Sequence, residues 1–576
     1  MTARRFHPVA ASAALAASLA LAACGAEVRT APAPPAAVVN RVHELRVALG
    51  ALRPGEGSAR AEITAPSGAR VSVAAFARRD AFAVRFRPLE PGVHTWRMLA
   101  GAGAGAGTAA REVGRGEVRA EELGAPGAVR VRGGALVTGG GRTFRPLGEN
   151  RFNVYDATWS DGLSIEAYVG RMATDGMNTL RVFVMTACGR AGTAPSPGCL
   201  EPGLGRFDEA VAARYDAVLD AAERHGVKVI LTAFAIGFTQ GDAWKGWEEN
   251  PYAVVRGGPA ATPRDFFTDP GAREAARRRL RYVLARWGAS PALLAVDLLN
   301  EPEWDGAIPE SAWIPWAEDL ARTWREEDPY ARPVTAGPVG LHWNVERDER
   351  AWWASGACEV VQWHRYGPDV YDVHALAAAL VATIRDTARY GKPVLLGEFG
   401  WGGDPAPLHD HTHVGIWAAT FAGAGVLAHS APPFTVDSDA PMTPARGRHF
   451  SALAGFLRRA EAKGSLAPAP DPPVSPAGAR ALVLGGERAV AVWLHAPASG
   501  YGSRIAGASV SVGGLARGRW RVTWVDDTSG LDEAWAEFEA RGGAVQLVAP
   551  PFARHVAALV ERVEGEEPAV RARLGR

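Results

Sequence analysis

Two glutamates each stand directly behind an apolar run that is typical of a buried strand. Glu301 follows residues 298–300 (Leu-Leu-Asn), and Glu398 follows residues 393–397 (Pro-Val-Leu-Leu-Gly). Two carboxyl groups at the ends of parallel strands can cleave a glycosidic bond, because one protonates the leaving oxygen while the other attacks or stabilises the sugar cation. The pair predicts this chemistry if one fold brings both strand ends together.

The segment from residue 143 to residue 457 alternates strand patterns with amphipathic helix patterns. We predict strands at 143–147, 178–185, 228–235, 293–299, 333–336, 360–363, 393–397 and 425–428. We predict helices at 165–174, 209–225, 272–287 and 373–390, with Ser164 as a cap and Gly226 as a stop. Eight such units predict an α/β fold of the (β/α)8 TIM barrel type rather than a doubly wound sheet. Glu301 then ends strand four and Glu398 strand seven, at the face where barrel active sites form.

Two β-sandwich domains are predicted to flank the barrel. Short alternating runs broken by glycine and proline predict the first sandwich, and residues 86–96 resemble the end of an immunoglobulin-like module. A proline-rich stretch precedes a second set of alternating runs. The predicted order is a signal peptide (1–23), a tether (24–40), the first sandwich (41–123), the barrel (124–465), a linker (466–476), the second sandwich (477–565) and a charged tail (566–576).

The N-terminus has the pattern of an export signal. Arg4 and Arg5 precede an apolar stretch over residues 9–22, and small residues lead to Cys24. This stretch is too short for a permanent membrane span. It resembles a bacterial lipoprotein signal, which implies lipidation of Cys24; the alternative is a plain secretory signal with an incidental cysteine. Because Gly25 takes the place of a retention aspartate, we expect an exported protein, lipid-anchored at the outer membrane or cell surface.

The remaining cysteines and the charge balance narrow the function classes. Cys188 and Cys199 are expected to form a disulfide in an oxidising compartment, and Cys358 is expected to be a buried thiol. No His or Cys pair stands near them at metal-ligand spacing, so we predict neither a metal nor a cofactor. The 63 basic and 62 acidic residues give a net charge of +1. Nucleic acid is therefore not an expected partner.

At its two glutamate motifs the chain resembles the clan of retaining glycoside hydrolases that includes family 5, the cellulase and mannanase family. The resemblance covers about residues 143–457 and is most specific at 299–302 (Leu-Asn-Glu-Pro) and 397–400 (Gly-Glu-Phe-Gly). It implies that Glu301 is the general acid/base, that Glu398 is the nucleophile, and that Asn300 holds the neighbouring sugar hydroxyl. A retaining pair lies about 5–5.5 Å apart, so the ionised nucleophile raises the pKa of the acid.

The resemblance implies roles for five further polar residues. Arg181, at the end of the second predicted strand, would orient the nucleophile and favour its charged form. After the sixth strand, Tyr366 would reach the nucleophile and His364 would line the sugar subsite. Glu149 and Asn150, at the first strand, would place polar side chains at the mouth of the barrel. An ion pair or a capping contact is the structural alternative for each of these side chains.

Tryptophans in the predicted loops are candidates for stacking against sugar rings. They are Trp244, Trp247, Trp304, Trp343 and Trp401. A flat ring suits the apolar face of a sugar, although tryptophans in long loops often only hold those loops. Because Trp401 lies three residues after Glu398, it is the main candidate for substrate binding, together with Trp304.

Two departures from the family pattern leave the substrate open. Relatives commonly carry a histidine after strand three and a tryptophan after strand eight, where this chain has Thr-Ala-Phe-Ala (232–235) and Ala-His-Ser-Ala (428–431). We expect a retaining β-glycosidase acting on a mannan- or glucan-like polysaccharide or oligosaccharide, with endo and exo cleavage both open. The alternatives are a non-catalytic surface glycan-binding protein with a retired barrel, and a transglycosylase with the same covalent intermediate.

Overall fold

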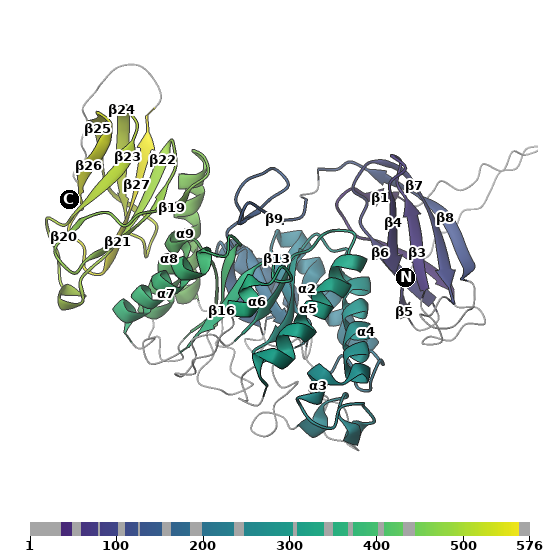
Figure 1. Ribbon diagram of the computed structural model, residues 1–576. Helices are drawn as coiled ribbons and strands as arrows, with labels where there is room; N and C mark the ends of the chain where they lie inside the picture. The colour runs from purple at the N-terminus through teal and green to yellow at the C-terminus, as the bar shows by residue number, and fades with distance from the viewer. Residues whose placement is uncertain are drawn as a thin grey trace, which may run out of the picture.

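The computed structural model describes residues 36–48, 59–78, 81–101, 110–124, 127–151, 163–184, 198–234, 247–302, 308–338, 350–366, 372–400, 408–429 and 444–563. These residues form a central α/β barrel with an all-β domain before it and another after it (Figure 1). The N-terminal domain is purple and the C-terminal domain yellow in Figure 1, on opposite sides of the barrel. Within the described ranges, no helix has both the length and the apolar character needed to cross a membrane.

Eight parallel strands form the barrel, as predicted. They are β11 (Leu147–Arg151), β12 (Thr179–Phe183), β13 (Lys228–Thr232), β14 (Leu293–Asn300), β15 (Val334–Gly337), β16 (Val361–Arg365), β17 (Val394–Phe399) and β18 (Gly425–Ala428). The hydrogen-bonded order runs β15-β14-β13-β12-β11-β18-β17-β16. The Glu359 amide donates to the Val334 carbonyl at 2.9 Å, and the Thr335 hydroxyl donates to the Val360 carbonyl at 2.8 Å. These bonds bring β15 beside β16 and close the barrel.

The helices of the barrel follow the predicted pattern. They are α1 (Ile165–Thr174), α2 (Glu209–His225), α3 (Asp265–Thr268), α4 (Pro270–Trp287), α5 (Glu310–Glu327), α6 (Arg350–Ala354), α7 (Val373–Ala388), α8 (Asp410–Ala422) and α9 (Pro444–Glu461). The Ser164 side chain caps α1 by accepting from the Ala167 amide at 3.2 Å. Gly226 ends α2 in the left-handed conformation, with φ of 72°. Both local signals therefore act as their residue types predict.

The first barrel strand corrects one prediction. The pattern predicts a strand at 143–147, but β11 begins at Leu147. Pro146 has no N–H to donate, and its carbonyl accepts from the Val426 amide at 2.9 Å just before the parallel ladder starts. Consequently Glu149 and Asn150 lie inside the strand instead of beyond its end.

A short hairpin closes the N-terminal end of the barrel. Its strands are β9 (Arg130–Arg132) and β10 (Ala135–Val137). Val129 and Leu136 at this hairpin pack against Ile230, Leu294 and Leu427. Because Val229 and Leu231 pack in the cluster under the helices, Ile230 between them faces the barrel interior. The apolar side chains of this cluster thus fill the barrel interior near the N-terminal ends of the strands.

The N-terminal domain is a sandwich of two sheets. Its strands are β1 (Ala36–Val38), β2 (His43–Ala48), β3 (Ala59–Thr64), β4 (Arg70–Ala74), β5 (Phe76–Arg78), β6 (Ala81–Phe86), β7 (Gly92–Ala100) and β8 (Arg111–Glu121), in the orders β1-β8-β7-β3-β4 and β2-β6-β5. Residues 36–38, predicted as tether, are paired in parallel with β8. Ala37 and Val39 bury their side chains in this sandwich, so these residues belong to the domain rather than to a tether.

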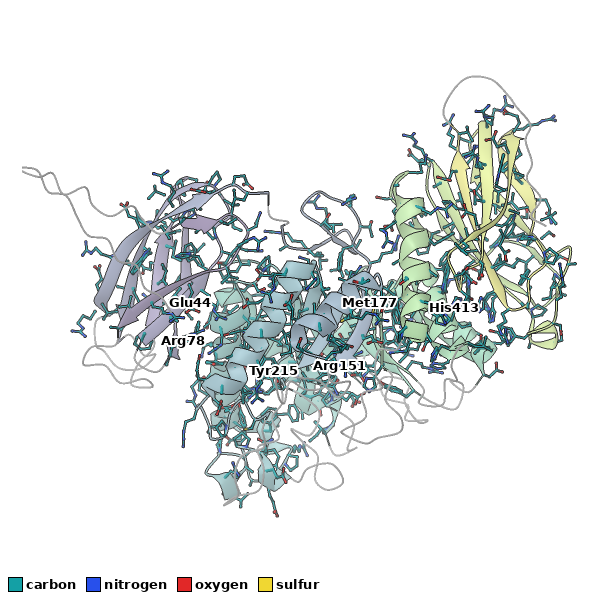
Figure 2. The ribbon with its side chains drawn as sticks, turned by 180° about the vertical axis from the view of Figure 1, so that it is seen from behind. Glu44, Arg78, Arg151, Met177, Tyr215 and His413 are labelled. Atoms are coloured by element: carbon teal, nitrogen blue, oxygen red, sulfur yellow. The ribbon has the colours of Figure 1, made fainter. Side chains whose placement is uncertain are left out.

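Ion pairs join this sandwich to the barrel. Arg85 on β6 donates to both carboxylate oxygens of Asp216 on α2, at 2.7 and 2.9 Å. Arg286 on α4 reaches the same carboxylate at 2.8 Å and is fully buried. Glu44 and Arg78, labelled in Figure 2, belong to the same network. These ion pairs thus connect the N-terminal sandwich to the helices of the barrel.

The C-terminal domain is a second sandwich. Its strands are β19 (Ala467–Ala469), β20 (Val474–Ser475), β21 (Arg480–Gly485), β22 (Ala489–His495), β23 (Ser509–Leu515), β24 (Gly518–Val525), β25 (Asp532–Ala540), β26 (Gly543–Val548) and β27 (His555–Arg562), in the orders β19-β21-β22-β27-β24-β25 and β20-β23-β26. The proline-rich stretch predicted as a linker instead supplies the edge strands β19 and β20. Edge strands tolerate proline because one side of the strand has no neighbour to receive an N–H.

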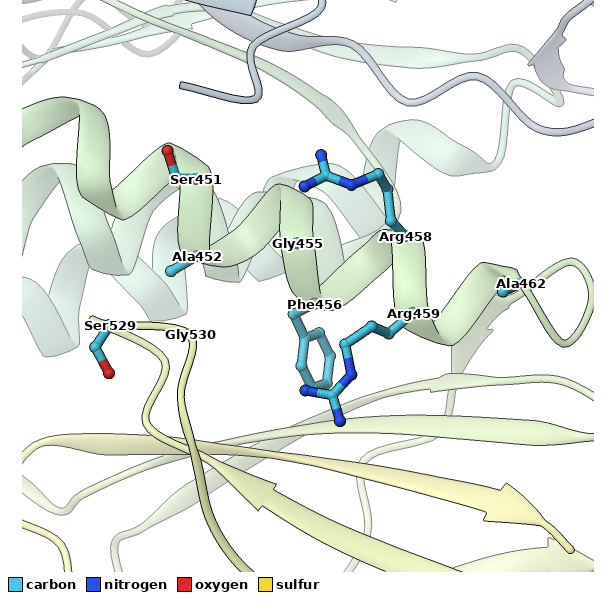
Figure 3. Close-up of a pocket in the computed structure, with 9 residues that line it drawn as sticks. All are labelled: Ser451, Ala452, Gly455, Phe456, Arg458, Arg459, Ala462, Ser529 and Gly530. Atoms are coloured by element: carbon cyan, nitrogen blue, oxygen red, sulfur yellow. The ribbon is translucent and has the colours of Figure 1, made fainter. Parts of the chain in front are cut away.

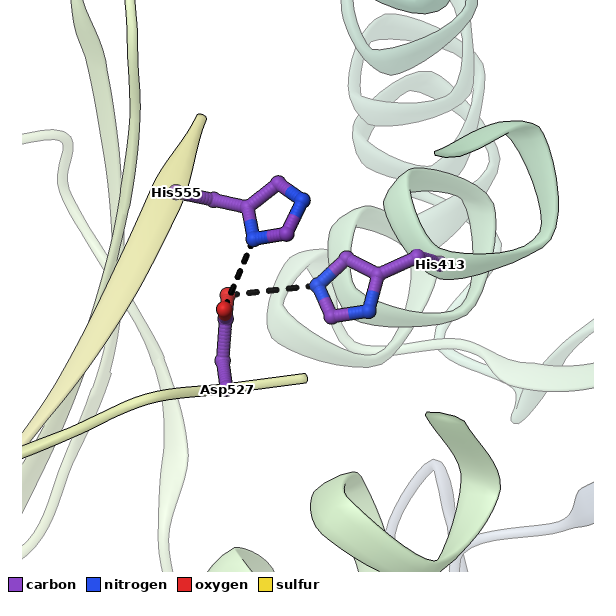
Figure 4. Close-up of side chains that lie close together, drawn as sticks. All are labelled: His413, Asp527 and His555. Carbon is purple, nitrogen blue, oxygen red and sulfur yellow. Dashed lines mark hydrogen bonds and ion pairs between the residues drawn. The ribbon is translucent and has the colours of Figure 1, made fainter. Parts of the chain in front are cut away.

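A buried carboxylate joins this sandwich to the barrel. Asp527 Oδ1 accepts from His555 Nδ1 at 2.7 Å, and Oδ2 accepts from His413 Nε2 on α8 at 3.2 Å and from Trp493 Nε1 at 2.7 Å (Figure 4). The His413 and His555 rings stack, with centroids 3.9 Å apart and planes 16° apart. The ligands of one metal ion converge on a point, whereas these stacked rings point side by side at two different oxygens. The geometry therefore fits hydrogen bonding better than metal coordination.

Candidate active site

Glu301 lies immediately beyond β14, at the C-terminal face of the barrel. Its backbone has a positive φ of 49°, and its amide donates to the Gly337 carbonyl at 2.7 Å. The side chain is buried, and this burial raises the pKa of Glu301 from 4.5 to about 7. A carboxyl group that stays protonated near neutral pH can act as a general acid.

Glu398 lies within β17 and receives two hydrogen bonds. Arg181 Nη1 donates to its Oε1 at 2.5 Å, and the Tyr366 hydroxyl donates to its Oε2 at 2.8 Å. Burial and the neighbouring carboxylates raise the pKa of Tyr366 well above its usual value, so its hydroxyl keeps its proton. Both donors complement a negatively charged carboxylate, which is the state a nucleophile requires.

The two carboxyl groups share one small space. A carboxyl oxygen of Glu301 lies within 4.8 Å of one of Glu398, and a His364 nitrogen lies within the same distance of both. His364 Nδ1 is 2.6 Å from Glu301 Oε1, and Nε2 is 3.8 Å from Glu398 Oε1. Burial lowers the pKa of His364 to about 4, so the ring is neutral between the two glutamates at pH 7.

These three side chains are also a group that could hold a cation. The 2.6 Å between His364 Nδ1 and Glu301 Oε1 is a hydrogen-bond distance. Two ligands that each lie about 2.1 Å from one octahedral ion are separated by about 3 Å. The arrangement therefore fits hydrogen bonding between these residues better than shared coordination.

Asp297 completes the site, and the sequence prediction did not include it. It is fully buried in β14, where its Oδ2 accepts from Arg181 Nε at 2.9 Å and from Nη2 at 2.6 Å. The Thr232 hydroxyl donates to the same oxygen at 2.9 Å. Asp297 thus fixes the arginine that donates to Glu398. A charged residue inside an otherwise apolar strand was the signal in the sequence that could have identified it.

Asn150 and Asn300 occupy the remaining donors of Arg181. Arg181 Nη1 donates to Asn150 Oδ1 at 3.1 Å, and Nη2 donates to Asn300 Oδ1 at 2.7 Å. The amide of Asn150 in turn donates to the Gly397 carbonyl at 2.8 Å. Asn300 Nδ2 is buried and has no hydrogen-bond partner among the residues described. Asn300 also acts to lower the pKa of Glu301, although burial outweighs it, so its amide lies near that carboxyl group.

Glu149 points to the other side of its strand. Register pairs Asn150 with Arg181, whose side chain faces the barrel interior, so the preceding residue faces outward. There Glu149 accepts from the Tyr168 hydroxyl at 2.8 Å and from Arg446 of α9. The structure places Glu149 in contact with the surrounding helices and away from the two catalytic candidates.

His429 follows β18, where the family pattern commonly has a tryptophan. Its amide donates to the Phe399 carbonyl at 2.7 Å, and its ring stands edge-on to Tyr366 with centroids 6.5 Å apart. Burial lowers the pKa of His429 to about 4. A neutral imidazole thus stands beside the hydroxyl that donates to Glu398. The sequence pattern indicated this departure from the family, but we predicted no role for the histidine.

Several predicted residues lie outside the described parts of the chain. They are Cys24, Cys188, Trp244, Trp304, Trp343 and Trp401. Trp247 is half-buried, and its Nε1 donates to the Ala261 carbonyl at 3.3 Å. Cys199 is disulfide-bonded, and Cys358 is a buried free thiol whose pKa burial raises to about 12.

A separate groove of about 610 Å³ lies between α9 and the turn that precedes β25 (Figure 3). Small residues, one phenylalanine and two arginines line it: Ser451, Ala452, Gly455, Phe456, Arg458, Arg459, Ala462, Ser529 and Gly530. Arg459 pairs with the exposed Asp532 at 2.6 Å. None of the catalytic candidates lines this groove.

Comparison with known proteins places the barrel among carbohydrate-active enzymes. Residues 141–426 match the family described as Cellulase (glycosyl hydrolase family 5). Mannan endo-1,4-beta-mannosidase 3 of Oryza sativa subsp. japonica is 26% identical over 311 residues, which cover 47% of this chain and 63% of the relative. Probable mannan endo-1,4-beta-mannosidase A-2 of Aspergillus terreus is 32% identical over 136 residues, 23% of this chain and 32% of that protein. The chain thus spans less than two thirds of the length of these relatives.

Solved structures share the fold at low sequence identity. A Bacteroides vulgatus protein described as a glycoside hydrolase has a TM-score of 0.61 at 16% identity, covering 92% of this chain and 100% of its own. A glycoside hydrolase family 5 structure from the same organism has a TM-score of 0.50 at 13% identity, covering 76% of this chain and 93% of its own. The first likeness extends through both flanking domains as well as the barrel.

Proposed function

The barrel belongs to the cellulase family, glycosyl hydrolase family 5, and we propose that the whole protein is a retaining glycoside hydrolase that cleaves β-mannan-like polysaccharides. The observation that carries the proposal is the pair of buried carboxyl groups with oxygens within 4.8 Å of each other. This closeness supports a double displacement, because an inverting pair is separated by about 6.5–9.5 Å to admit a water. Mannan is proposed because the relatives are named mannan endo-1,4-beta-mannosidases.

In the first proposed step Glu398 attacks the anomeric carbon, and the bond from that carbon to the leaving oxygen breaks. The proton of Glu301 passes to the leaving oxygen, so one sugar departs as an alcohol and Glu301 becomes a carboxylate. Glu398 and the other sugar are now joined by an ester. Arg181 and Tyr366 orient the attacking carboxylate through the bonds they donate to it.

In the second step Glu301 takes a proton from a water molecule whose oxygen attacks the same carbon. The ester bond breaks, and Glu398 leaves as a carboxylate. Two inversions at one carbon give net retention of configuration. The amide of Asn300, next to Glu301 in the chain, suits the hydroxyl beside the reacting carbon, where a hydrogen bond that strengthens in the transition state speeds both steps.

The direct test is to incubate the full-length protein with β-1,4-mannan, β-1,4-glucan and xylan and to follow the products by NMR. We expect mannan to be cleaved and the β-anomer to form first. A first-formed α-anomer would contradict a retaining mechanism, and cleavage of glucan alone would contradict mannan as the substrate. Binding of mannan without cleavage would instead indicate a glycan-binding protein, and longer products in the presence of added oligosaccharide would indicate a transglycosylase.

We also propose export and lipid anchoring through Cys24, a residue outside the described ranges. The support is the N-terminal sequence, in which a charged start and an apolar stretch lead to a cysteine. A Cys24→Ser variant should move from the membrane fraction to the soluble fraction. Membrane retention of that variant would contradict anchoring at this residue.

A further inference from the structure

Two buried arginines and a half-buried lysine lie where the N-terminal sandwich meets the N-terminal ends of the barrel strands. Arg87 directly follows β6 of the sandwich. Arg332 lies just before β15, and Lys228 is the first residue of β13. Arg87 is 2% exposed and Arg332 is 1% exposed. The sandwich and the barrel thus bring two buried guanidinium groups together beside Lys228, on the opposite side of the barrel from the glutamates.

One tyrosine ring holds both guanidinium groups. The guanidinium carbon of Arg87 lies 4.6 Å from the centroid of the Tyr330 ring, and that of Arg332 lies 5.7 Å from the same centroid. The Arg87 amide donates to the Tyr330 hydroxyl at 2.7 Å. The cations are therefore positioned by specific contacts and do not extend into solvent.

Most of their hydrogen-bond donors are unused. Nε, Nη1 and Nη2 of Arg87 and Nε and Nη1 of Arg332 are buried without a partner among the described residues. Arg332 Nη2 donates to the Ser290 carbonyl at 2.7 Å, and Lys228 Nζ donates to the Pro291 carbonyl at 2.8 Å. Buried N–H groups are almost always paired, and a buried charge without a counter-charge costs several kcal/mol.

The nearby carboxylates are bonded to other groups. Asp328 accepts from the backbone amides of Tyr330 and Arg332 at 2.9 and 2.6 Å. Glu223 accepts from the Ser290 hydroxyl at 2.7 Å. Neither forms an ion pair with Arg87, Arg332 or Lys228 in the described structure. Burial, together with the like charge of Arg87, lowers the pKa of Arg332 to about 9. Burial, together with the like charges of Arg332 and Arg87, lowers the pKa of Lys228 to about 8.

We propose that this cluster binds a small inorganic oxyanion, phosphate or sulfate, and that the bound anion fastens the N-terminal sandwich to the barrel. A guanidinium fork presents paired N–H groups that match two oxygens of a tetrahedral anion. Five guanidinium nitrogens from two domains have N–H groups available to donate to such an ion, and the burial of both arginines excludes a polymer. This site is independent of the proposed glycosidase activity.

The test is thermal unfolding of the full-length protein while sodium chloride is replaced by sodium phosphate, or by sodium sulfate, at constant pH and ionic strength. A ligand of the folded state raises Tm by mass action, here by about 1–3 °C for each tenfold increase above its Kd. The anion giving the larger rise is the preferred ligand. If neither raises Tm relative to chloride, the cluster is solvated by water alone and the proposal is wrong.

Variants distinguish a specific site from a general salt effect. Arg87→Met and Arg332→Met should each abolish the rise, and Arg87→Met in chloride should unfold no earlier than the parent because it removes an unpaired buried charge. Arg87→Lys keeps the charge without the fork and should weaken the rise. Arg119→Met removes an exposed arginine of β8 and should keep the parental response. An equal rise in the parent and Arg87→Met would overturn the site.

Discussion

Glu301 and Glu398 share one pocket but differ in what surrounds their carboxyl groups. Glu398 accepts from a guanidinium and a phenol, both suited to a carboxylate. Glu301 contacts the neutral ring of His364 in a desolvated position. Different surroundings can give one carboxyl the role of acid and the other that of nucleophile, as in retaining glycosidases generally.

The nucleophile can be tested by replacing Glu398 with glutamine. Glu398→Gln keeps the size of the side chain but removes the attacking oxygen, so we expect kcat to fall by about 10³-fold or more. The control is Glu117→Gln on the exposed face of β8, which should keep parental activity. Circular dichroism checks that both variants fold. Turnover by Glu398→Gln within tenfold of the parent would remove Glu398 from the nucleophile's role.

The acid can be tested through pH. Because burial raises the pKa of Glu301 from 4.5 to about 7, kcat/KM should decline as pH rises through about 7 and the acid loses its proton. The same group contributes stability that is complete below pH 4.5 and lost as pH rises through about 7, by up to about 3 kcal/mol. Glu301→Gln should therefore be inactive but unfold at a higher temperature than the parent at pH 8. Equal Tm values for the two proteins at pH 8 would argue against the raised pKa.

Irregular pairing at the ends of the barrel strands sets the direction of the side chains around Glu301 and Glu398. Register shifts occur between Asp297 and Asn300 on β14 and between Trp363 and His364 on β16, and the second shift sets His364 opposite Glu398. Bulges of this kind redirect a side chain at the edge of a sheet. At Glu301 the chain also adopts a positive φ, which regular strand geometry does not contain.

Gly337 at the end of β15 is the element-level test of this packing. A Cβ there would lie 2.3 Å from Gln362 Nε2, 2.9 Å from His364 Nε2 and 3.1 Å from Arg181 Nη2. Gly337→Ala should therefore displace the residues around both glutamates and lower kcat/KM by about tenfold or more. At Gly356 a Cβ would meet nothing within 4 Å, so Gly356→Ala is the matched control. Parental kinetics for Gly337→Ala would show that the site tolerates this displacement.

At the scale of the whole molecule, charged groups join the barrel to each sandwich. Asp216 receives arginines from both bodies on the N-terminal side, and Asp527 receives His413 from the barrel on the C-terminal side. Removing one member of a buried charged network is costly because its partners remain desolvated. The flanking domains are thus fixed supports of the barrel and not loosely linked modules.

The C-terminal junction can be tested with Asp527→Asn. Its partners hold the pKa of Asp527 far below the usual range, so stability from this carboxylate is present above about pH 4 and is lost only in strong acid. Asp527→Asn should lower the free energy of unfolding at pH 7 by about 3–5 kcal/mol. Asp532→Asn, which removes an exposed ion pair with Arg459, should change it by about 1 kcal/mol or less. Similar thermal unfolding of the two variants would contradict the role of the junction.

The sequence was sufficient to predict the barrel, the two sandwiches and the placement of Glu301 and Glu398 on strands four and seven. Hydrophobic periodicity and helix caps are local signals, and all eight strands of a parallel barrel present their C-terminal ends at the same face. Ser164 and Gly226 act where their residue types predict. Counting units along the chain was therefore enough to bring two distant motifs to one face.

Only the tertiary structure decided how the side chains around that pair are used. Asn150 and Glu149 are adjacent in sequence, yet one joins Arg181 in the barrel and the other joins Tyr168 outside it, because β11 begins after Pro146 and alternate residues face opposite ways. Asp297 orients an arginine 116 positions away. Partners so distant in sequence are set by strand register and packing, which no local pattern encodes. The two glutamates can thus be identified from the sequence, whereas the different contacts around each of them form only when the barrel closes.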